Sequence, residues 1–355
     1  MTTATAKAKA TTIDALALKN ALDSVKIALP KTGMVVIGGG CVVASTSELR
    51  ISVPLDGADF EPLMVNHAKL FAIAGVAVGK LKLKPAGTLL EVANGRGNWS
   101  LPTGPATIEP VPSGSPLIRL AAEHLRRMVN QCLPAVDDES SRYALGGVRI
   151  EIAGETAWFV ATDGRRCHIV TAAANQDVDD RCVILPKAAA TAIAGECKKF
   201  PHDSAQLDVS GVALIAEIHG TTIVATLLSG DYPRWRDVMP HDTAPAAVAG
   251  AGALLAAVRQ AAIVTSETSK AVQFVFDDRG TIAMSGQSAE SGTSSVTIDA
   301  EVSKSLRVRL DPTFVLEWLS EADPAVPVQI IATDSQSAVV LRHDDATGVL
   351  SPMEE

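Results

Sequence analysis

Cysteine is scarce in this chain of 355 residues, and long apolar runs are absent. The five cysteines form no CxxC pair, and no histidine lies at zinc-finger spacing from them, so neither a disulfide framework nor a metal site is predicted. A reduced compartment, the cytoplasm, is expected. The sequence has no span of about 20 apolar residues, so no membrane helix is predicted. Residues 1–12 are small, polar and lysine-bearing, and we expect them to form a disordered tail.

Motifs of catalysis and nucleotide hydrolysis are also lacking. No GxxxxGK[ST] loop occurs, and Val43 stands where a dinucleotide loop starting at Gly38 would need its third glycine. The acidic groups at 137–139 and 177–180 fit Asx-rich loops better than metal sites. No grouping of Ser, His and Asp indicates a catalytic set, so we predict no enzyme activity and no cofactor.

What the sequence does contain is one unit stated three times: a helix, a strand pair, a second helix and a strand pair. Apolar residues at i, i+4, i+7 and i+11 predict the first helices within 18–29, 121–132 and 254–265. The second helices are predicted from Asn66, Leu185 and Leu310, with Asn66 and Asp311 as N-caps. Alternating runs between them predict antiparallel hairpins. The repeat is far longer than a solenoid unit and indicates duplicated α+β domains.

The net charge of −9 argues against a nucleic-acid partner, but the distribution of cations argues for one. In each first helix a cation follows the apolar stripe by one position, which places these cations on one flank of equivalent helices. The alternative is an ordinary solvated helix face, and both interpretations stay open. The cations concerned are Lys19, Lys26, Arg126, Arg127 and Arg259, and the second helix of the middle copy adds Lys187, Lys198 and Lys199.

Three segments of the middle copy carry a family resemblance. They are SRYALGGVRIEI from Ser141, FVATDGRRCHIV from Phe159 and SGDYPRWRDVMP from Ser229. In this order and spacing they resemble the bacterial DNA polymerase III beta subunit, the DNA sliding clamp. The resemblance continues through AAIVTSE near Ala261, DPTFVLEWL and the final VLSPM, and it is weak in the first copy.

The resemblance implies three tandem copies of the DNA-clamp domain, each with two helices packed on antiparallel sheets, at residues 13–114, 115–241 and 242–355. Two subunits would close head to tail into a ring around double-stranded DNA, without sequence preference. Such a clamp is a non-catalytic processivity factor, and the cations named above would face the phosphates. The implied partners are the replicative DNA polymerase and the clamp loader, with repair polymerases, mismatch repair proteins and ligase as further candidates, in the cytoplasm at the nucleoid and not at a membrane.

The resemblance also implies a groove, between the second and third copies, for partner peptides that carry hydrophobic and aromatic residues. Apolar and adaptable side chains at the matching positions suit such anchors. Asp237, Cys167 and the terminal Glu354-Glu355 depart from the family pattern, so we expect a preference for partners with nearby Lys or Arg. The matching positions are Leu145, Thr162, Gly164, Arg165, Arg166, Cys167, Pro233, Val238, Val349, Leu350, Ser351, Pro352 and Met353.

The subunit interface of the implied ring maps to Trp99 and Leu101 in the first copy and to Ile263 and Val264 in the third. Pairing of edge strands there would extend a sheet across subunits, although Pro102 cannot donate to a ladder. For Trp99, an ordinary half-buried strand position is the alternative. For the whole chain, the alternatives are a specialised clamp paralogue for repair or mobile-element replication, and an interaction scaffold without DNA binding.

Overall fold

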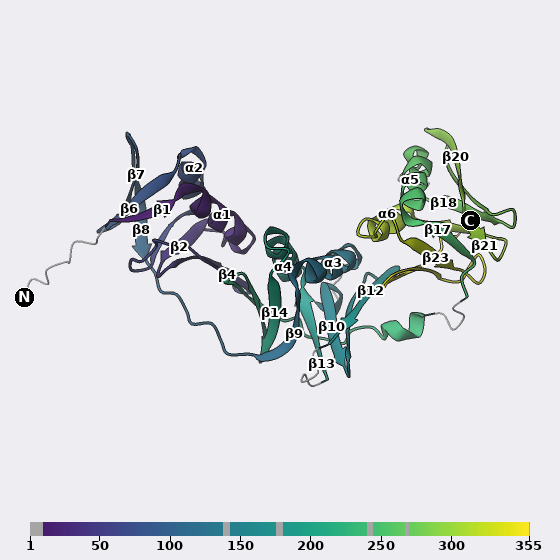
Figure 1. Ribbon diagram of the computed structural model, residues 1–355, viewed down its shortest axis with the longest axis horizontal. Coiled ribbons are helices and arrows are strands. Elements are labelled where there is room, and N and C mark those ends of the chain that lie inside the picture. The colour runs from purple at the N-terminus through teal and green to yellow at the C-terminus, as the bar shows by residue number, and fades with distance from the viewer. Residues whose placement is uncertain (1–9, 138–142, 175–179, 240–243, 267–269, 355) are drawn as a thin grey trace, which may run out of the picture. The chain divides into compact units, whose positions relative to one another are not determined.

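The structure, a computed structural model, describes residues 10–137, 143–174, 180–239, 244–266 and 270–354 (Figure 1). The chain forms two compact units. Unit 1 comprises Met1–Arg126 with Ala188–Leu227, and unit 2 comprises Arg127–Lys187 with Leu228–Glu355. Within each unit, helices pack on antiparallel sheets. No helix in the described ranges is long and apolar enough to cross a membrane.

Unit 1 is built on one twelve-stranded sheet in the order β1-β6-β7-β8-β5-β2-β3-β4-β16-β15-β14-β9. Apolar residues alternate with exposed ones along most of these strands, so one face of the sheet is buried. The strands are β1 (Thr11–Asp14), β2 (Met34–Gly38), β3 (Cys41–Ser45), β4 (Leu49–Pro54), β5 (Leu63–Asn66), β6 (Lys80–Ala86), β7 (Leu89–Asn94), β8 (Gly97–Pro105), β9 (Ser115–Ala121), β14 (Ser204–Ser210), β15 (Ala213–Ile218) and β16 (Thr221–Thr226).

Two helices of unit 1 begin at side-chain caps, and the sequence predicts the one at Asn66. The Asp14 carboxylate accepts a hydrogen bond from the Ala17 amide at 2.9 Å, and the Asn66 side chain accepts one from the Lys69 amide at 3.0 Å. The first helix ends in a single 3₁₀ turn, Lys26–Ala28. The α-helices are α1 (Ala15–Val25), α2 (His67–Val76), the start of α3 (Ala122–Cys132) and all of α4 (Lys187–Lys199) except its first residue.

Unit 2 contains a nine-stranded sheet, β13-β10-β11-β12-β25-β24-β23-β17-β21, and a four-stranded sheet, β20-β19-β18-β22. The helix α5 (Ala251–Ala261) packs on the smaller sheet, and the Asp311 carboxylate caps α6 (Pro312–Leu319). The strands are β10 (Gly147–Ala153), β11 (Thr156–Thr162), β12 (Arg166–Ala173), β13 (Arg181–Pro186), β17 (Ala247–Gly250), β18 (Val272–Asp277), β19 (Thr281–Ser288), β20 (Gly292–Asp299), β21 (Glu301–Val302), β22 (Leu306–Leu310), β23 (Pro327–Ile331), β24 (Val339–His343) and β25 (Ala346–Leu350).

The helices and hairpins predicted from the sequence are confirmed, but their ends differ: α1 and α5 each begin three residues before the predicted apolar stripe and end four residues before its last residue. The tail predicted for 1–12 is too long at its end, because Thr11 and Thr12 pair with Leu83 and Lys82 in the sheet; residues 1–9 lie outside the described residues. The helix predicted from Leu185 begins at Lys187, because Leu185 and Pro186 belong to the end of β13. The three-copy division stays an interpretation, and the sheets run across its boundaries because β4 pairs with β16 and β12 pairs with β25.

Candidate partner groove and nucleic-acid interface

The turn between β11 and β12 is fixed by its own side chains. The Asp163 carboxylate accepts hydrogen bonds from the amides of Arg165 and Arg166 at 2.9 and 3.0 Å, and the Thr162 hydroxyl accepts one from the Gly164 amide at 3.1 Å. Gly164 has a φ of +86°, a left-handed conformation that favours glycine, as the Asp-Gly pattern predicts. The turn therefore presents its backbone and Arg165 in one defined geometry.

Arg166 holds this turn in place. Its side chain is only 9% exposed, its Nε donates to the Asp163 carboxylate at 3.0 Å, and its guanidinium also contacts Glu317 and the Pro134 carbonyl. The guanidinium lies 4.2 Å from the centroid of the Phe314 ring. The resemblance implies a place for Arg166 in the partner groove. In the structure its guanidinium binds Glu317 of α6 and the Pro134 carbonyl of the 3₁₀ turn Leu133–Ala135.

The remaining groove positions of unit 2 divide into a buried floor and an exposed rim. Cys167 belongs to one apolar cluster with Val349 and with Tyr232 and Trp235 of the segment before residue 240. Burial raises the pKa of the Cys167 thiol to about 12, so it acts as an apolar side chain. The buried positions are Leu145, Thr162, Cys167, Val349 and Leu350; the accessible ones are Arg165, Pro233, Ser351, Pro352, Met353 and Val238, of which Val238 is 51% exposed.

A strap over the sheet, residues 232–239, holds the rim. The Tyr232 hydroxyl donates to the Val160 carbonyl at 3.2 Å, and burial raises the pKa of that hydroxyl. The guanidinium of Arg236 lies 5.0 Å from the Trp158 ring and 4.1 Å from the Trp235 ring, and it pairs with Glu151 at 2.8 Å. The motif SGDYPRWRDVMP points to this strap, but not to the cation–π stack, because Trp158 and Glu151 are far away in the sequence.

The carboxyl-terminal segment crosses from the turn at Arg165 to β22. The Ser351 amide donates to the Arg165 carbonyl at 2.9 Å, and the Met353 amide donates to the Arg309 carbonyl at 2.8 Å. A guanidinium nitrogen of Arg309 then binds the Glu354 carbonyl at 3.1 Å, which leaves the Glu354 carboxylate exposed. Glu355 lies outside the described residues. An acidic end thus lies next to the rim.

Among the predicted DNA contacts, several cations are paired with carboxylates. Arg126 binds Glu123 at 2.7 Å, and this hydrogen bond lowers the pKa of Glu123. Arg127 pairs with Asp345, and Lys199 binds Glu196 at 3.0 Å. Lys19 lies 5.9 Å from the Phe71 ring, and Lys187 is half-buried. Of the eight, Lys26, Lys198 and Arg259 are exposed and have no carboxylate of the described chain within ion-pair distance.

The predicted interface residues lie beside open sheet edges. Residues 97–102 of β8 pair with β7 along one side, and its neighbour on the other side, β5, reaches only residues 103–105. Trp99 and Leu101 of this segment are half-buried, and the Trp99 ring covers Gly97, where an added Cβ would lie 2.6 Å from the indole. In unit 2, β20 ends its sheet; Ile263, 77% exposed, and half-buried Val264 are in the 3₁₀ turn Ala262–Val264 that packs next to β20.

Within the described residues, no group of three His, Cys, Asp or Glu side chains is placed to hold a metal ion. Glu151, a carboxylate beside the groove, is paired with Arg236 and Arg149. Burial opposes ionisation of Glu151, but these two hydrogen bonds hold its pKa below the ordinary value. The geometry therefore offers surfaces for binding.

Comparison with known proteins finds a family model that matches the central part of the chain, and distant relatives. The family model of the DNA polymerase III beta subunit, central domain, matches residues 119–234. The beta sliding clamp of Vibrio cholerae is 28% identical over 198 residues, 55% of this chain and 54% of the relative. That of Pseudomonas putida is 26% identical over 273 residues, 74% and 73% of the two chains. The chain thus spans about half the length of the first of these relatives.

Solved structures give the fold. The DNA polymerase III subunit beta from Pseudomonas aeruginosa superposes with a TM-score of 0.87 at 22% identity, covering 98% of this chain and 100% of that one. A putative DNA polymerase III beta subunit from Eubacterium rectale superposes with a TM-score of 0.89 at 16% identity over the same shares. The chain therefore has the sliding-clamp fold throughout, and its central part matches the DNA polymerase III beta-subunit family.

Proposed function

We propose that two copies of this chain close into a ring that encircles double-stranded DNA and serves as a sliding, non-catalytic processivity factor. The observation that carries this proposal is a strand junction that occurs twice within the chain. In unit 1, β4 pairs antiparallel with β16, and in unit 2, β12 pairs antiparallel with β25. Each junction pairs the third strand after the first helix of one copy with the third strand after the second helix of the next copy.

The same rule leaves one pair of equivalent strands over. By position in the repeat, β20 of the third copy corresponds to β4 and β12, and β8 of the first copy corresponds to β16 and β25. Both strands have an open edge, so β20 of one molecule against β8 of another repeats the junction. Unpaired edges are prone to associate, and this pairing would cover both. Exposed Ile263 and half-buried Trp99 supply apolar contacts beside it.

DNA contact through exposed Lys26, Lys198 and Arg259 suits sliding. Cations that touch only phosphates give sequence-independent, salt-sensitive binding. The net charge of −9 means that the rest of the surface repels DNA. The pairing of Arg126, Arg127 and Lys199 with carboxylates weakens the lining, and this favours the scaffold without DNA binding as the second candidate function.

The groove of unit 2 would dock partners. Its rim of Pro233, Val238, Pro352 and Met353 offers adaptable apolar surface to a peptide with hydrophobic and aromatic anchors. The exposed Glu354 carboxylate next to this rim supports a preference for peptides with flanking Lys or Arg, which salt would weaken. By family, the partners would be the replicative polymerase and the clamp loader, in the cytoplasm with the chromosome.

The deciding experiment loads the protein with a clamp loader onto nicked circular DNA and then linearises the DNA. An encircling ring stays on the circle and is lost from the linear form, whereas a scaffold is retained on neither. Retention that ignores topology would contradict the ring. Sedimentation supplies the second arm: about twice 36.9 kDa is expected, and Trp99→Ala should shift the protein toward monomer.

A matched pair of variants tests the lining. Lys26→Ala, Lys198→Ala and Arg259→Ala together should shorten retention on the circle and lower the salt slope by about one unit for each lost phosphate contact, with the dimer intact. Lys84→Ala is the control, because Lys84 is an exposed cation of β6 that pairs with Glu91. Equal slopes for both proteins would show that the lining lies elsewhere.

A further inference from the structure

Two sheets of unit 2 repeat one arrangement of four strands. In the sheet of the partner groove the order is β13-β10-β11-β12, and in the smaller sheet it is β22-β18-β19-β20. Val148 of β10 pairs with Leu185 of β13, which lies two residues before α4. Val272 of β18 pairs with Leu310 of β22, which lies two residues before α6. The registers therefore agree, and each position of one sheet has an equivalent in the other.

The shared register places a counterpart of the partner groove on β19 and β20. In the groove, Thr162 of β11 pairs with Cys167 of β12. At the equivalent positions, Gln287 of β19 pairs with Thr293 of β20. These two residues line a cavity of about 540 Å³, and ligand sites in proteins have volumes of about 300–1,000 Å³. The smaller sheet thus has a cavity of ligand size where the other sheet has the groove.

The lining of this cavity is polar where the groove is apolar. Ser285 stands at the position of Val160, and Arg309 stands at the position of Ile184, two members of the apolar cluster under the strap. Gln273 pairs with both Ser285 and Arg309, so these three side chains form one row on one face of the sheet. Hydroxyl, amide and guanidinium groups favour a ligand that forms hydrogen bonds over an apolar anchor.

Arg309 gives the cavity its charge. Among the described residues that line the cavity there is no Asp or Glu, although the chain has a net charge of −9. One guanidinium nitrogen donates to the Glu354 carbonyl at 3.1 Å, and no ion pair joins Arg309 to a carboxylate of the described chain. The remaining N–H groups can donate two hydrogen bonds to one carboxylate. The cavity therefore suits an acidic ligand.

A polypeptide already follows the equivalent path over the groove sheet. The Leu228 amide donates to the Ile184 carbonyl at 3.0 Å, and the strap 232–239 then crosses the sheet. On the smaller sheet, the Met353 amide makes the equivalent hydrogen bond, to the Arg309 carbonyl at 2.8 Å. The main chain thus approaches both sheets in the same way, which favours a peptide segment as the occupant of the cavity over a small anion.

We propose that this cavity binds an acidic peptide segment of a partner protein. A Glu or Asp carboxylate of the segment binds the Arg309 guanidinium, and its other polar groups bind Gln273, Ser285 and Thr293. The chemistry differs from that of the groove, which suits hydrophobic and aromatic anchors. This site does not depend on the proposed ring, on DNA or on occupancy of the groove, because every lining residue belongs to unit 2 of one molecule.

The test is fluorescence anisotropy of a labelled, end-blocked hexapeptide of alternating Thr and Glu, titrated with the full-length protein without DNA. We expect saturable binding, and the matching peptide of alternating Thr and Gln should bind about tenfold or more weakly. Arg309→Gln should remove this difference between the two peptides. Arg307→Gln is the matched control, because Arg307 is an exposed cation on the same face of β22 outside the cavity, and this variant should bind as the parent does.

Two further arms make the outcome decisive. Ser285→Tyr places a ring in the cavity without changing charge, at a strand position that suits aromatic residues, and it should abolish binding while Tm stays close to the parent. Thr297→Tyr adds the same ring at an exposed position of β20 outside the cavity and should bind normally. Sodium acetate is added as a competitor. Equal affinity for the two peptides, equal loss in Arg307→Gln and Arg309→Gln, or displacement by equimolar acetate would each overturn the proposal.

Discussion

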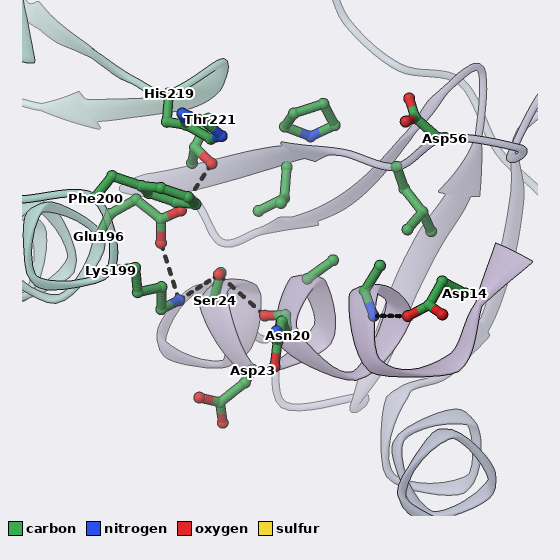
Figure 2. A pocket seen from close by; sticks show the side chains of 15 residues that line it. Asp14, Asn20, Asp23, Ser24, Asp56, Glu196, Lys199, Phe200, His219 and Thr221 are labelled. Carbon is green, nitrogen blue, oxygen red and sulfur yellow. Dashed lines mark hydrogen bonds and ion pairs between the residues drawn. The ribbon is translucent and has the colours of Figure 1, made fainter. Parts of the chain in front are cut away.

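The two strand junctions of this chain are built alike, but the helices beside them pack differently. Beside β12–β25 in unit 2, the Trp318 indole is 1% exposed and lies against Gly348. Beside β4–β16 in unit 1, α1 presents Ala17 and Ala21 to a cavity (Figure 2). Protein interiors are close-packed, and the large Trp318 ring fills the space beside the first junction. The small side chains of α1 leave space beside the second.

Polar contacts follow the same division. In unit 2 the Gln131 amide donates to the Trp318 carbonyl at 2.8 Å, and Arg127 pairs with Asp345. In unit 1 the ammonium of Lys199 joins Ser24 of α1 to Glu196 of α4. We infer that the closer packing makes the junction in unit 2 open as one cooperative element.

The largest effect is expected from Trp318→Ala, which opens the closed junction. Removing a fully buried indole leaves a void that the surroundings fill only in part, at a cost of about 3–5 kcal/mol in the free energy of unfolding of unit 2. Hydrogen exchange of the β12 and β25 amides measures it residue by residue. Trp99→Ala, the same truncation at a half-buried site, is the control; if both variants left these amides equally protected, Trp318 would not close the junction.

Gly348→Ala should break the same junction from the other side. A Cβ at Gly348 would lie 2.6 Å from the Trp318 ring, so the ring or the strand must shift. Overpacking of this kind costs about 1–3 kcal/mol, again seen by hydrogen exchange at β25. Gly75→Ala is the control, because an added Cβ at Gly75 of α2 meets open space, and it should cost nothing measurable. Gly154→Ala is unsuitable because Gly154 has a positive φ. Equal losses in both would contradict the close contact.

Acid should weaken the junction in unit 2 more than that in unit 1. Burial lowers the pKa of His168 to about 4, although its Nδ1 contacts the Gln131 carbonyl at 2.7 Å and the charges of Arg166 and Asp163 act in opposite directions. The unfolded chain therefore binds this proton first as pH falls below about 6.5. The contribution of His168 is intact above that pH and is lost toward pH 4, by about 2 kcal/mol at pH 5.

The measurement is urea unfolding of unit 2 between pH 7.5 and pH 4.5. His168→Gln should flatten the profile, whatever its effect at neutral pH. His219→Gln in unit 1 changes an exposed imidazole and should leave the slope of unit 2 as it is. A parent profile without slope in this window, or a slope that survives in His168→Gln, would show that His168 is not the group that titrates.

The sequence predicts helices and caps well because their signals are local. Asn66 and Asp311 bind amides two or three residues ahead, and the Asp163-Gly164 turn is closed by neighbours. The contact of Arg166 with Glu317 could not be predicted from the sequence, because the two residues are 151 positions apart. The cavity of unit 1 could not be predicted for the same reason. Small residues on α1 leave space only where β4 and α4 face them, and the periodicity of the sequence does not show which elements meet.

Ala21→Leu should sharpen the comparison with the smallest effect, by making the open junction resemble the closed one. Ala21 lines the cavity, and leucine is a good helix former, so the added methyl groups enter existing space at little cost in helix propensity. We expect unit 1 to gain up to about 1 kcal/mol in the free energy of unfolding, measured by hydrogen exchange of the α1 amides. Ala28→Leu is the contrast, since Ala28 is fully buried and does not line the cavity, and this change should destabilise. If Ala21→Leu lost as much stability as Ala28→Leu, the helices of unit 1 would be as closely packed as those beside Trp318, and side-chain size would no longer explain the difference between the junctions.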